Sequence, residues 1–283
     1  MLKNLLAPMI VLMIMLMGCT APARTNEQPQ IVATIFPQYD FARVIVGDKA
    51  DVILLLPPGV ESHTYQPTSS EVIAVENADL FIYSGESLEP WAKNFQTNNA
   101  LDISQNVPRE DDPHIWTNPN NAKIMIDNIL RELCVIDPEN ADYYLENAAE
   151  YKQQLAALDE RFSQIPKGKI IFAGENPMHY FLEQYDFPHD AAIDSCNGES
   201  EPAAKAVARI ISDINEQGIS AIFYTELSSP SLADAITRET GAIPMLLHSC
   251  HNVSKAEKEA GETYLTLMNK NAETLEAVFS EGV

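Results

Sequence analysis

The sequence of 283 residues has little positive charge: 18 Lys and Arg residues stand against 41 Asp and Glu residues, which gives a formal net charge of −23. Sequence-independent binding of nucleic acid needs a basic face, so this composition excludes nucleic acid as a partner. The same shortage argues against binding to anionic lipid through a polybasic patch. Because 46% of the residues are hydrophobic and only 21% are charged, we expect a folded, acidic globular body.

The N-terminus lacks an apolar run long enough to cross a membrane. Its apolar stretch at 5–17 is shorter than the roughly 20 residues that a membrane-spanning helix needs. The stretch ends in the sequence LMGC, which resembles the cleavage site of a bacterial lipoprotein. We therefore predict a signal peptide at 1–18, lipid attachment at Cys19, and a polar, Pro-containing tether at 19–30.

Cysteine is scarce. Beyond Cys19 the chain contains Cys134, Cys196 and Cys250, and an odd number cannot form a complete disulfide framework. An exported protein meets oxidising conditions, and Cys134 lies in the first half of the chain. The pair that we predict, if one forms, is therefore Cys196 with Cys250.

The local signatures of several enzyme classes are absent from the sequence. It contains no HExxH, CxxC, P-loop, GxGxxG or GxSxG motif. A catalytic zinc keeps one coordination position open for water, usually beside a glutamate that acts as general base, and no local pattern here predicts that arrangement. We therefore expect a protein that is not an enzyme, with a secreted zinc hydrolase as the least favoured alternative.

Short apolar segments alternate with segments of helical periodicity, which predicts an α/β architecture with mainly parallel sheets. A long helix is expected at 138–165, and a single helix of this length would leave the parts that it joins little freedom to swing. We predict two parallel-sheet (β/α) lobes, at 31–137 and 166–283, joined by this rigid linker helix. The predicted strands are 31–36, 50–56, 80–83, 169–173, 221–224 and 243–247.

Three of the six histidines occupy positions where a ligand could bind. His63 follows the predicted strand 50–56, and His248 follows the predicted strand 243–247, one in each lobe. Ligands of parallel α/β sheets bind at the carboxyl ends of strands, so both side chains are expected near the space between the lobes. His114 lies in a loop before a helix. A site of imidazoles between the lobes would suit a late first-row cation.

Longer motifs resemble those of a known family. They are PGVESHTYQPT at 58–68, ADLFIY at 78–83, DPHIWTNP at 112–119, the long helix, the dipeptide EP at 201–202 and YLTLM at 264–268. Together they resemble the solute-binding lipoproteins of zinc and manganese ABC importers, the TroA-like, ZnuA-type group, over roughly residues 31 to 283. The resemblance implies two lobes around a linker helix with one metal ion buried between them. It also implies a monomer, lipid-anchored to the outer face of the bacterial cytoplasmic membrane, that delivers the ion to an ABC permease.

The resemblance also implies metal ligands, position by position. His63 and His114 match the first two ligands. The third ligand position falls on Glu175, expected at the start of a helix, with His179 one turn later as the alternative ligand or as a residue that orients it. The fourth is usually an aspartate, and His248 stands in its place. Among the remaining candidates, His251 and, less favoured, Cys250 are alternatives to His248, Glu226 is expected to support the site, and His189 is expected to be an exposed loop residue.

Three imidazoles and one carboxylate suit Zn²⁺ in a nearly tetrahedral site, whereas Mn²⁺ prefers more oxygen ligands. We therefore expect one transported Zn²⁺, with Mn²⁺ as the alternative. Binding needs neutral imidazoles, so the affinity should fall as the pH drops through about 6.5. A metal-independent surface adhesin is a second alternative, because some proteins of this group are called adhesins.

Overall fold

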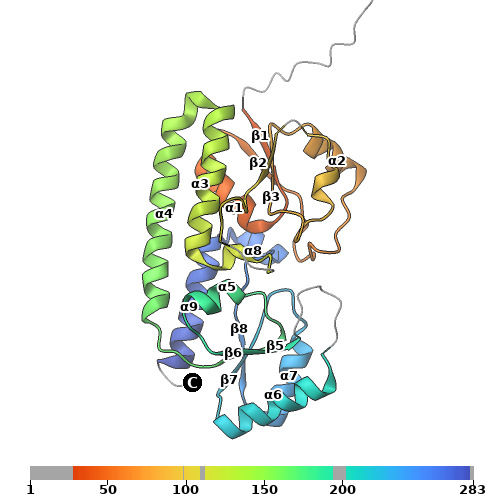
Figure 1. Ribbon diagram of the computed structural model, residues 1–283, viewed down its shortest axis with the longest axis vertical. Helices are drawn as coiled ribbons and strands as arrows, with labels where there is room; N and C mark the ends of the chain where they lie inside the picture. The colour runs from red at the N-terminus through yellow and green to blue at the C-terminus, as the bar shows by residue number, and fades with distance from the viewer. Residues whose placement is uncertain (1–27, 98, 109–111, 194–201, 281–283) are drawn as a thin grey trace, which may run out of the picture.

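The computed structural model describes residues 28–97, 99–108, 112–193 and 202–280, and within them two parallel sheets lie one above the other (Figure 1). Each sheet has four strands, in the order β2-β1-β3-β4 in the first sheet and β6-β5-β7-β8 in the second. Helices flank both sheets. The predicted α/β fold with two parallel-sheet lobes is therefore confirmed.

Apolar sequences form the centre of the first sheet. Strands β1 (Gln30–Ala33) and β3 (Leu80–Tyr83) are mostly buried, as expected for parallel strands covered on both faces. Strand β2 (Asp51–Leu54) alternates between exposed and half-buried residues at one edge, and β4 (Ala100–Asp102) forms the other edge. The carboxyl ends of these strands point toward the second sheet, where a bound ligand would be expected.

The second sheet has the same organisation. Strands β5 (Ile170–Glu175) and β7 (Ala221–Tyr224) lie in the centre, and β6 (His189–Ile193) and β8 (Ile243–Leu246) lie at the edges. The edge strands β4 and β6 were not expected from the sequence, because both carry polar residues. Glu175 belongs to β5 as its last residue, which corrects the expectation that it opens a helix.

Local signals account for the ends of several helices. Thr68 caps α2 by accepting the N–H of Glu71, whose carboxylate in turn accepts the N–H of Thr68. Gly218 and Gly241 end α6 and α7 in the left-handed conformation that glycine adopts readily.

The flanking helices are α1 (Phe36–Val46), α2 (Ser69–Glu76), α5 (His179–Gln184), α6 (Ala204–Gln217), α7 (Pro230–Thr240) and α8 (Lys255–Ala260), with 3₁₀ turns at Ala92–Asn94, Ile115–Thr117 and Pro138–Asn140.

The helix α4 (Ala141–Gln164) leads from the first lobe to the second, and it forms a helical hairpin with α3 (Pro119–Ile136), which packs beside it (Figure 1). The sequence predicted one helix at 138–165, and the structure places a 3₁₀ turn at 138–140 before α4 begins. Two packed helices resist bending more than one, so the hairpin supports the expected stiffness of the connection.

The last helix, α9 (Tyr264–Phe279), returns to the first half of the chain. It packs against α4 and α1. The side chain of Asp40 in α1 accepts the N–H of Tyr264 at 2.9 Å, and Arg161 of α4 binds both carboxylate oxygens of Glu276 at 2.8 and 2.7 Å. The C-terminal segment is thereby fixed to the N-terminal lobe and to the linker.

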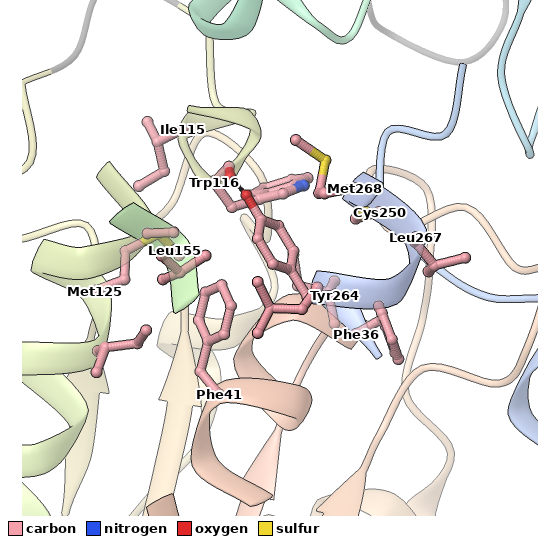
Figure 2. Packing of buried hydrophobic residues seen from close by; sticks show 14 of the residues in the cluster. Phe36, Phe41, Ile115, Trp116, Met125, Leu155, Cys250, Tyr264, Leu267 and Met268 are labelled. Carbon is pink, nitrogen blue, oxygen red and sulfur yellow. Dashed lines mark hydrogen bonds between the residues drawn. The ribbon is translucent and has the colours of Figure 1, made fainter. Parts of the chain in front are cut away.

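One hydrophobic core joins the two halves beneath the loops that carry the histidines (Figure 2). Trp116 is fully buried, and its indole N–H donates to the carbonyl of Ser249 at 2.9 Å. The hydroxyl of Tyr264 donates to the carbonyl of Trp116 at 2.6 Å. Cys250 lies in the same core. The residues next to His114 and His251 are therefore held by shared packing.

The boundaries 31–137, 138–165 and 166–283 stay predictions, and residues 252–264 lie against the N-terminal lobe although they follow the second sheet. Among the residues described, no helix is both long and apolar enough to cross a membrane. The predicted signal peptide, Cys19 and most of the tether lie outside the described residues.

Candidate metal centre

His63 lies on the loop between β2 and α2, and this loop is bound to the C-terminal half of the chain. The side-chain amide of Asn252 donates to the carbonyl oxygens of Pro57 and Val60 at 2.8 and 2.9 Å. Asn252 itself is fully buried. These bonds fix the position of the loop three residues before His63, so the imidazole is presented from a rigid segment.

His114 is oriented by the residue two positions before it. One carboxylate oxygen of Asp112 accepts both the backbone N–H of His114 at 2.7 Å and its ring Nδ1–H at 2.8 Å. Burial opposes ionisation of Asp112, but the hydrogen bonds from His114 lower the pKa of this carboxyl and keep it charged. With Nδ1 donating, Nε2 of His114 carries the lone pair. A carboxylate behind an imidazole in this way is the usual support of a metal-binding histidine.

His251 reaches the same region after a turn that follows β8. Cys250 has a positive φ of 60°, an uncommon conformation for a residue with a side chain, and it reverses the direction of the chain. The backbone N–H of His251 then donates to Glu226 at 3.0 Å, and its ring Nε2 lies 2.6 Å from the hydroxyl of Ser62. This hydrogen bond links the ring to the residue adjacent to His63.

The three imidazoles form a compact group. The ring centroids are 5.6 Å apart for His63 and His114, 5.9 Å for His63 and His251, and 5.5 Å for His114 and His251. Rings that bind one zinc ion at about 2.0–2.1 Å have centroids roughly 5 Å apart, so these three rings are spaced slightly more widely than in a loaded site. The Nε2 atom of His63 is buried without a hydrogen-bond partner, which a metal ion would supply.

The environment favours the neutral form of His63 and His251. Burial, and to a smaller extent the neighbouring His114, lowers the pKa of His63. Burial and then the two other rings lower the pKa of His251 well below its ordinary value. A neutral imidazole has a lone pair for a metal, so both shifts favour cation binding near neutral pH.

Two carboxylates border the same space. A cavity of about 820 Å³ between the two sheets is lined by His114, His251, Glu61 and Glu175, with Glu175 at the carboxyl end of β5. Glu61 lies 3.8 Å from Nε2 of His251. His63, His114 and Glu61 come from the first half of the chain, whereas His251 follows β8 and Glu175 ends β5, both strands of the second sheet. A cation in this cavity would therefore meet oxygen ligands from both lobes.

His248 lies apart from this group. Its ring is almost completely buried, with nitrogen atoms 3.7 Å from Glu226 and 3.5 Å from Glu257. Its Nδ1 accepts the N–H of Cys250 at 2.9 Å, so the ring stabilises the turn that presents His251. Burial opposes protonation, but the two carboxylates raise the pKa of His248. Because Nδ1 accepts the hydrogen bond from Cys250, it carries a lone pair, and the ring proton lies on Nε2, which faces Glu257. His248 therefore supports the loop, whereas the ring of His251 lies with those of His63 and His114.

Glu226 lies behind the site, as the sequence suggested. Its carboxylate accepts the N–H of Ser249 at 2.8 Å, the hydroxyl of Ser249 at 2.7 Å and the N–H of His251 at 3.0 Å. It thereby fixes the backbone of the loop that carries His251. In the sequence, Glu226 was a candidate because it follows the predicted strand 221–224.

The remaining candidates fall elsewhere. His179 begins α5 and lies with Glu183 and His189 rather than with the three rings. His189 is the first residue of β6, not a loop residue. Cys250 is a fully buried free thiol among the described residues, and Cys196, its predicted disulfide partner, lies outside them. Burial raises the pKa of the Cys250 thiol, which leaves it protonated and a poor metal ligand.

Comparison with known proteins agrees with this architecture. The profile of the family described as zinc-uptake complex component A, periplasmic, matches residues 31–278. The high-affinity zinc uptake system protein ZnuA of Bacillus subtilis is 27% identical over 279 residues, which cover 88% of this chain and 87% of that protein. The zinc-binding lipoprotein AdcA of Streptococcus pneumoniae is 27% identical over 92% of this chain, and the matched part is 58% of its length.

Solved structures give the same result. The Zn(II)-bound ZnuA-like domain of AdcA superposes with a TM-score of 0.77 at 26% identity, covering 89% of this chain and 99% of the domain. The laminin-binding protein Lmb of Streptococcus agalactiae, described as having adhesin and metal-transporting activity, gives a TM-score of 0.78 at 25% identity over 87% of this chain and 98% of that one.

Proposed function

The chain belongs to the family of zinc-uptake complex component A, and on that premise we propose that it captures Zn²⁺ outside the cytoplasm and delivers it to an ABC permease. The family consists of metal-binding transport receptors rather than enzymes. The observation that carries the proposal is the group of three imidazoles, His63, His114 and His251, of which His114 and His251 line the cavity between the two sheets.

We assign the ligands as these three histidines with Glu175 as the fourth. Glu175 lines the same cavity as His114 and His251, and it is the carboxylate that the second sheet contributes. Three nitrogen atoms and one carboxylate oxygen are the donors of a closed tetrahedral zinc site, which favours Zn²⁺ over Mn²⁺. Relative to the ligand set expected from the sequence, His251 replaces His248.

Capture is proposed to need only a small movement. The loops of His63, His114 and His251 are tied together by Asn252, by the bond between Ser62 and His251, and by the core around Trp116. The three imidazoles are therefore preorganised, and the approach of Glu175 from the other lobe completes the shell. No bond is made or broken in this cycle apart from those to the ion.

The location of the chain completes the proposal. The sequence at 16–19 predicts lipid attachment at Cys19, so that the receptor would be held as a monomer at the outer face of the bacterial cytoplasmic membrane. The permease would open the lobes and receive the ion, with energy from its ATPase. Radiolabelled fatty acid incorporated by wild type but not by Cys19→Ala would support the anchor, and equal labelling of both would contradict it.

Equilibrium dialysis with metal analysis tests the receptor function. Purified wild-type protein should retain zinc in preference to manganese at equal free concentrations. The double variant His63→Ala/His114→Ala should lose tight binding while its far-UV circular dichroism stays unchanged. Zinc binding equal to wild type in this variant would refute the site.

A surface-binding role is the second candidate, because Lmb is described as an adhesin as well as a metal transporter. A protein that acts only as an adhesin would bind no metal ion and would not be stabilised by one. The melting temperature should therefore rise with added zinc if the chain is a receptor, and a melting temperature that changes with neither zinc nor manganese would favour the adhesive role.

A further inference from the structure

We propose that His179, Glu183 and His189 form a second binding site for a late first-row divalent cation, on the C-terminal lobe and separate from the interlobe centre. One donor atom from each of the three side chains lies within 4.8 Å of the other two. Two imidazoles and one carboxylate are ligands that Zn²⁺ and its neighbours in the series accept. None of the three residues belongs to the group of His63, His114 and His251.

The first two ligands are one turn apart on the same helix. His179 and Glu183 are four residues apart on α5, so their side chains project from the same face. Phe181 and Leu182, between them, are fully buried and anchor α5 in the core. The helix is thus held by its apolar side, and the pair of potential ligands stands on its other side.

The third ligand is held by the turn after α5. The N–H of Phe187 donates to the carbonyl of Leu182 at 3.0 Å, and the ring of Phe187 stacks on Phe181 at 5.9 Å between centroids. His189 then begins β6, in register with Ile170 of β5. The backbone on both sides of the cluster is therefore fixed by packing, which lowers the entropic cost of bringing the three ligands to one ion.

The ring of His189 is oriented by a backbone carbonyl. Its Nδ1 lies 3.0 Å from the carbonyl oxygen of Phe187, and a carbonyl can only accept, so Nδ1 carries a proton. This leaves Nε2 as the nitrogen that can bind a cation. A backbone carbonyl behind the imidazole is a common support of metal-binding histidines.

The second site should be weaker than the first and should exchange freely. Three protein ligands leave at least one coordination position to water, and Glu183 is exposed. The two centres are not fully independent. Burial raises the pKa of Asp112, which supports His114, and the interactions with His114 and, to a smaller extent, His179 lower it. Variants of Glu183 and His189 therefore separate the two sites more cleanly than variants of His179.

Zinc titration of the purified, metal-stripped protein tests the proposal. Wild type should bind two zinc ions per chain at saturation, and one of them should be lost on gel filtration. Glu183→Gln/His189→Ala should bind one ion, and Glu183→Lys, which adds a positive charge at the surface, should give the same loss. Asp186→Asn is the matched control, since it removes an exposed carboxylate from the adjacent turn, where asparagine tolerates the left-handed backbone.

The outcomes separate this site from the proposed receptor site. His63→Ala/His114→Ala should lose the retained ion and keep the exchangeable one. If Glu183→Gln/His189→Ala and Glu183→Lys bind as many ions as wild type, the second site is refuted, whatever the fate of the first. If Asp186→Asn loses the exchangeable ion equally, that ion is bound by the general acidic surface, and the proposal is also overturned.

Discussion

Replacing His251 by asparagine is expected to weaken zinc binding about 100-fold, whereas the same replacement of His248 should weaken it by less than about 10-fold. A four-ligand structural zinc site is worth about 10–16 kcal/mol, so one ligand contributes about 3 kcal/mol, and each 1.4 kcal/mol is a factor of ten. The ring of His251 lies within 6 Å of His63 and His114, whereas that of His248 faces Glu226 and Glu257.

Asparagine makes the two variants comparable. In His248→Asn the side-chain oxygen can still accept the N–H of Cys250, and in His251→Asn the backbone N–H that binds Glu226 is kept. Competition between the metal-stripped protein and a fluorescent zinc chelator measures both dissociation constants, and thermal unfolding without metal checks that both variants fold. A larger loss in His248→Asn than in His251→Asn would refute the assignment of His251 as ligand.

Zinc affinity should persist below pH 6.5, because burial and the neighbouring rings lower the pKa of His63 and His251 and delay competition by protons. Dissociation constants measured from about pH 8 down to 5 would contradict this if they already increase by the time the pH has fallen to 6.5. Glu226→Gln should weaken zinc binding about 10-fold, since an amide cannot accept from both the Ser249 and His251 N–H groups, and unchanged chelator competition would show that the loop does not need this carboxylate. Burial raises the pKa of Glu89 to about 7, so this group's contribution to the unfolding free energy should fall by about 3 kcal/mol as the pH rises from 4.5 to 7. In urea unfolding, the free energy of Glu89→Gln should change less with pH than that of wild type, and parallel curves would refute the raised pKa of Glu89.

The parts of the site that could be predicted from the sequence lie in contiguous segments. His63 and His114 stand within motifs whose loops follow directly from a strand end or precede a capped helix. Glu175 was expected from the resemblance, although it ends a strand rather than opening a helix. The apolar periodicity at 138–165 predicted α4, because a helix that packs through one face shows this in its local spacing.

The proposed choice of His251 over His248 could not be made in this way, and the sequence offered His251 only as the alternative. The rule that ligands bind at strand ends selects the first polar residue after β8, which is His248. The chain instead turns at Cys250 through a positive φ, and the side chain of His248 stabilises that turn. Positive φ is rare for residues other than glycine, and it is set here by the surrounding core. Edge strands β4 and β6 were missed because pairing with a neighbouring strand, rather than their own sequence, makes them strands.

The return of the chain to the N-terminal lobe after β8 has a consequence for the lifetime of the bound ion. His251 is bound through its ring to Ser62, beside His63, and through its backbone to Glu226, which follows β7 of the second sheet, so it lies where the two lobes meet. The three imidazoles are then held in place before an ion arrives, and its arrival should be fast. If Glu175 is the fourth ligand, the departure rate should depend strongly on this one carboxylate, because loss of that bond leaves a three-coordinate ion open to replacement ligands.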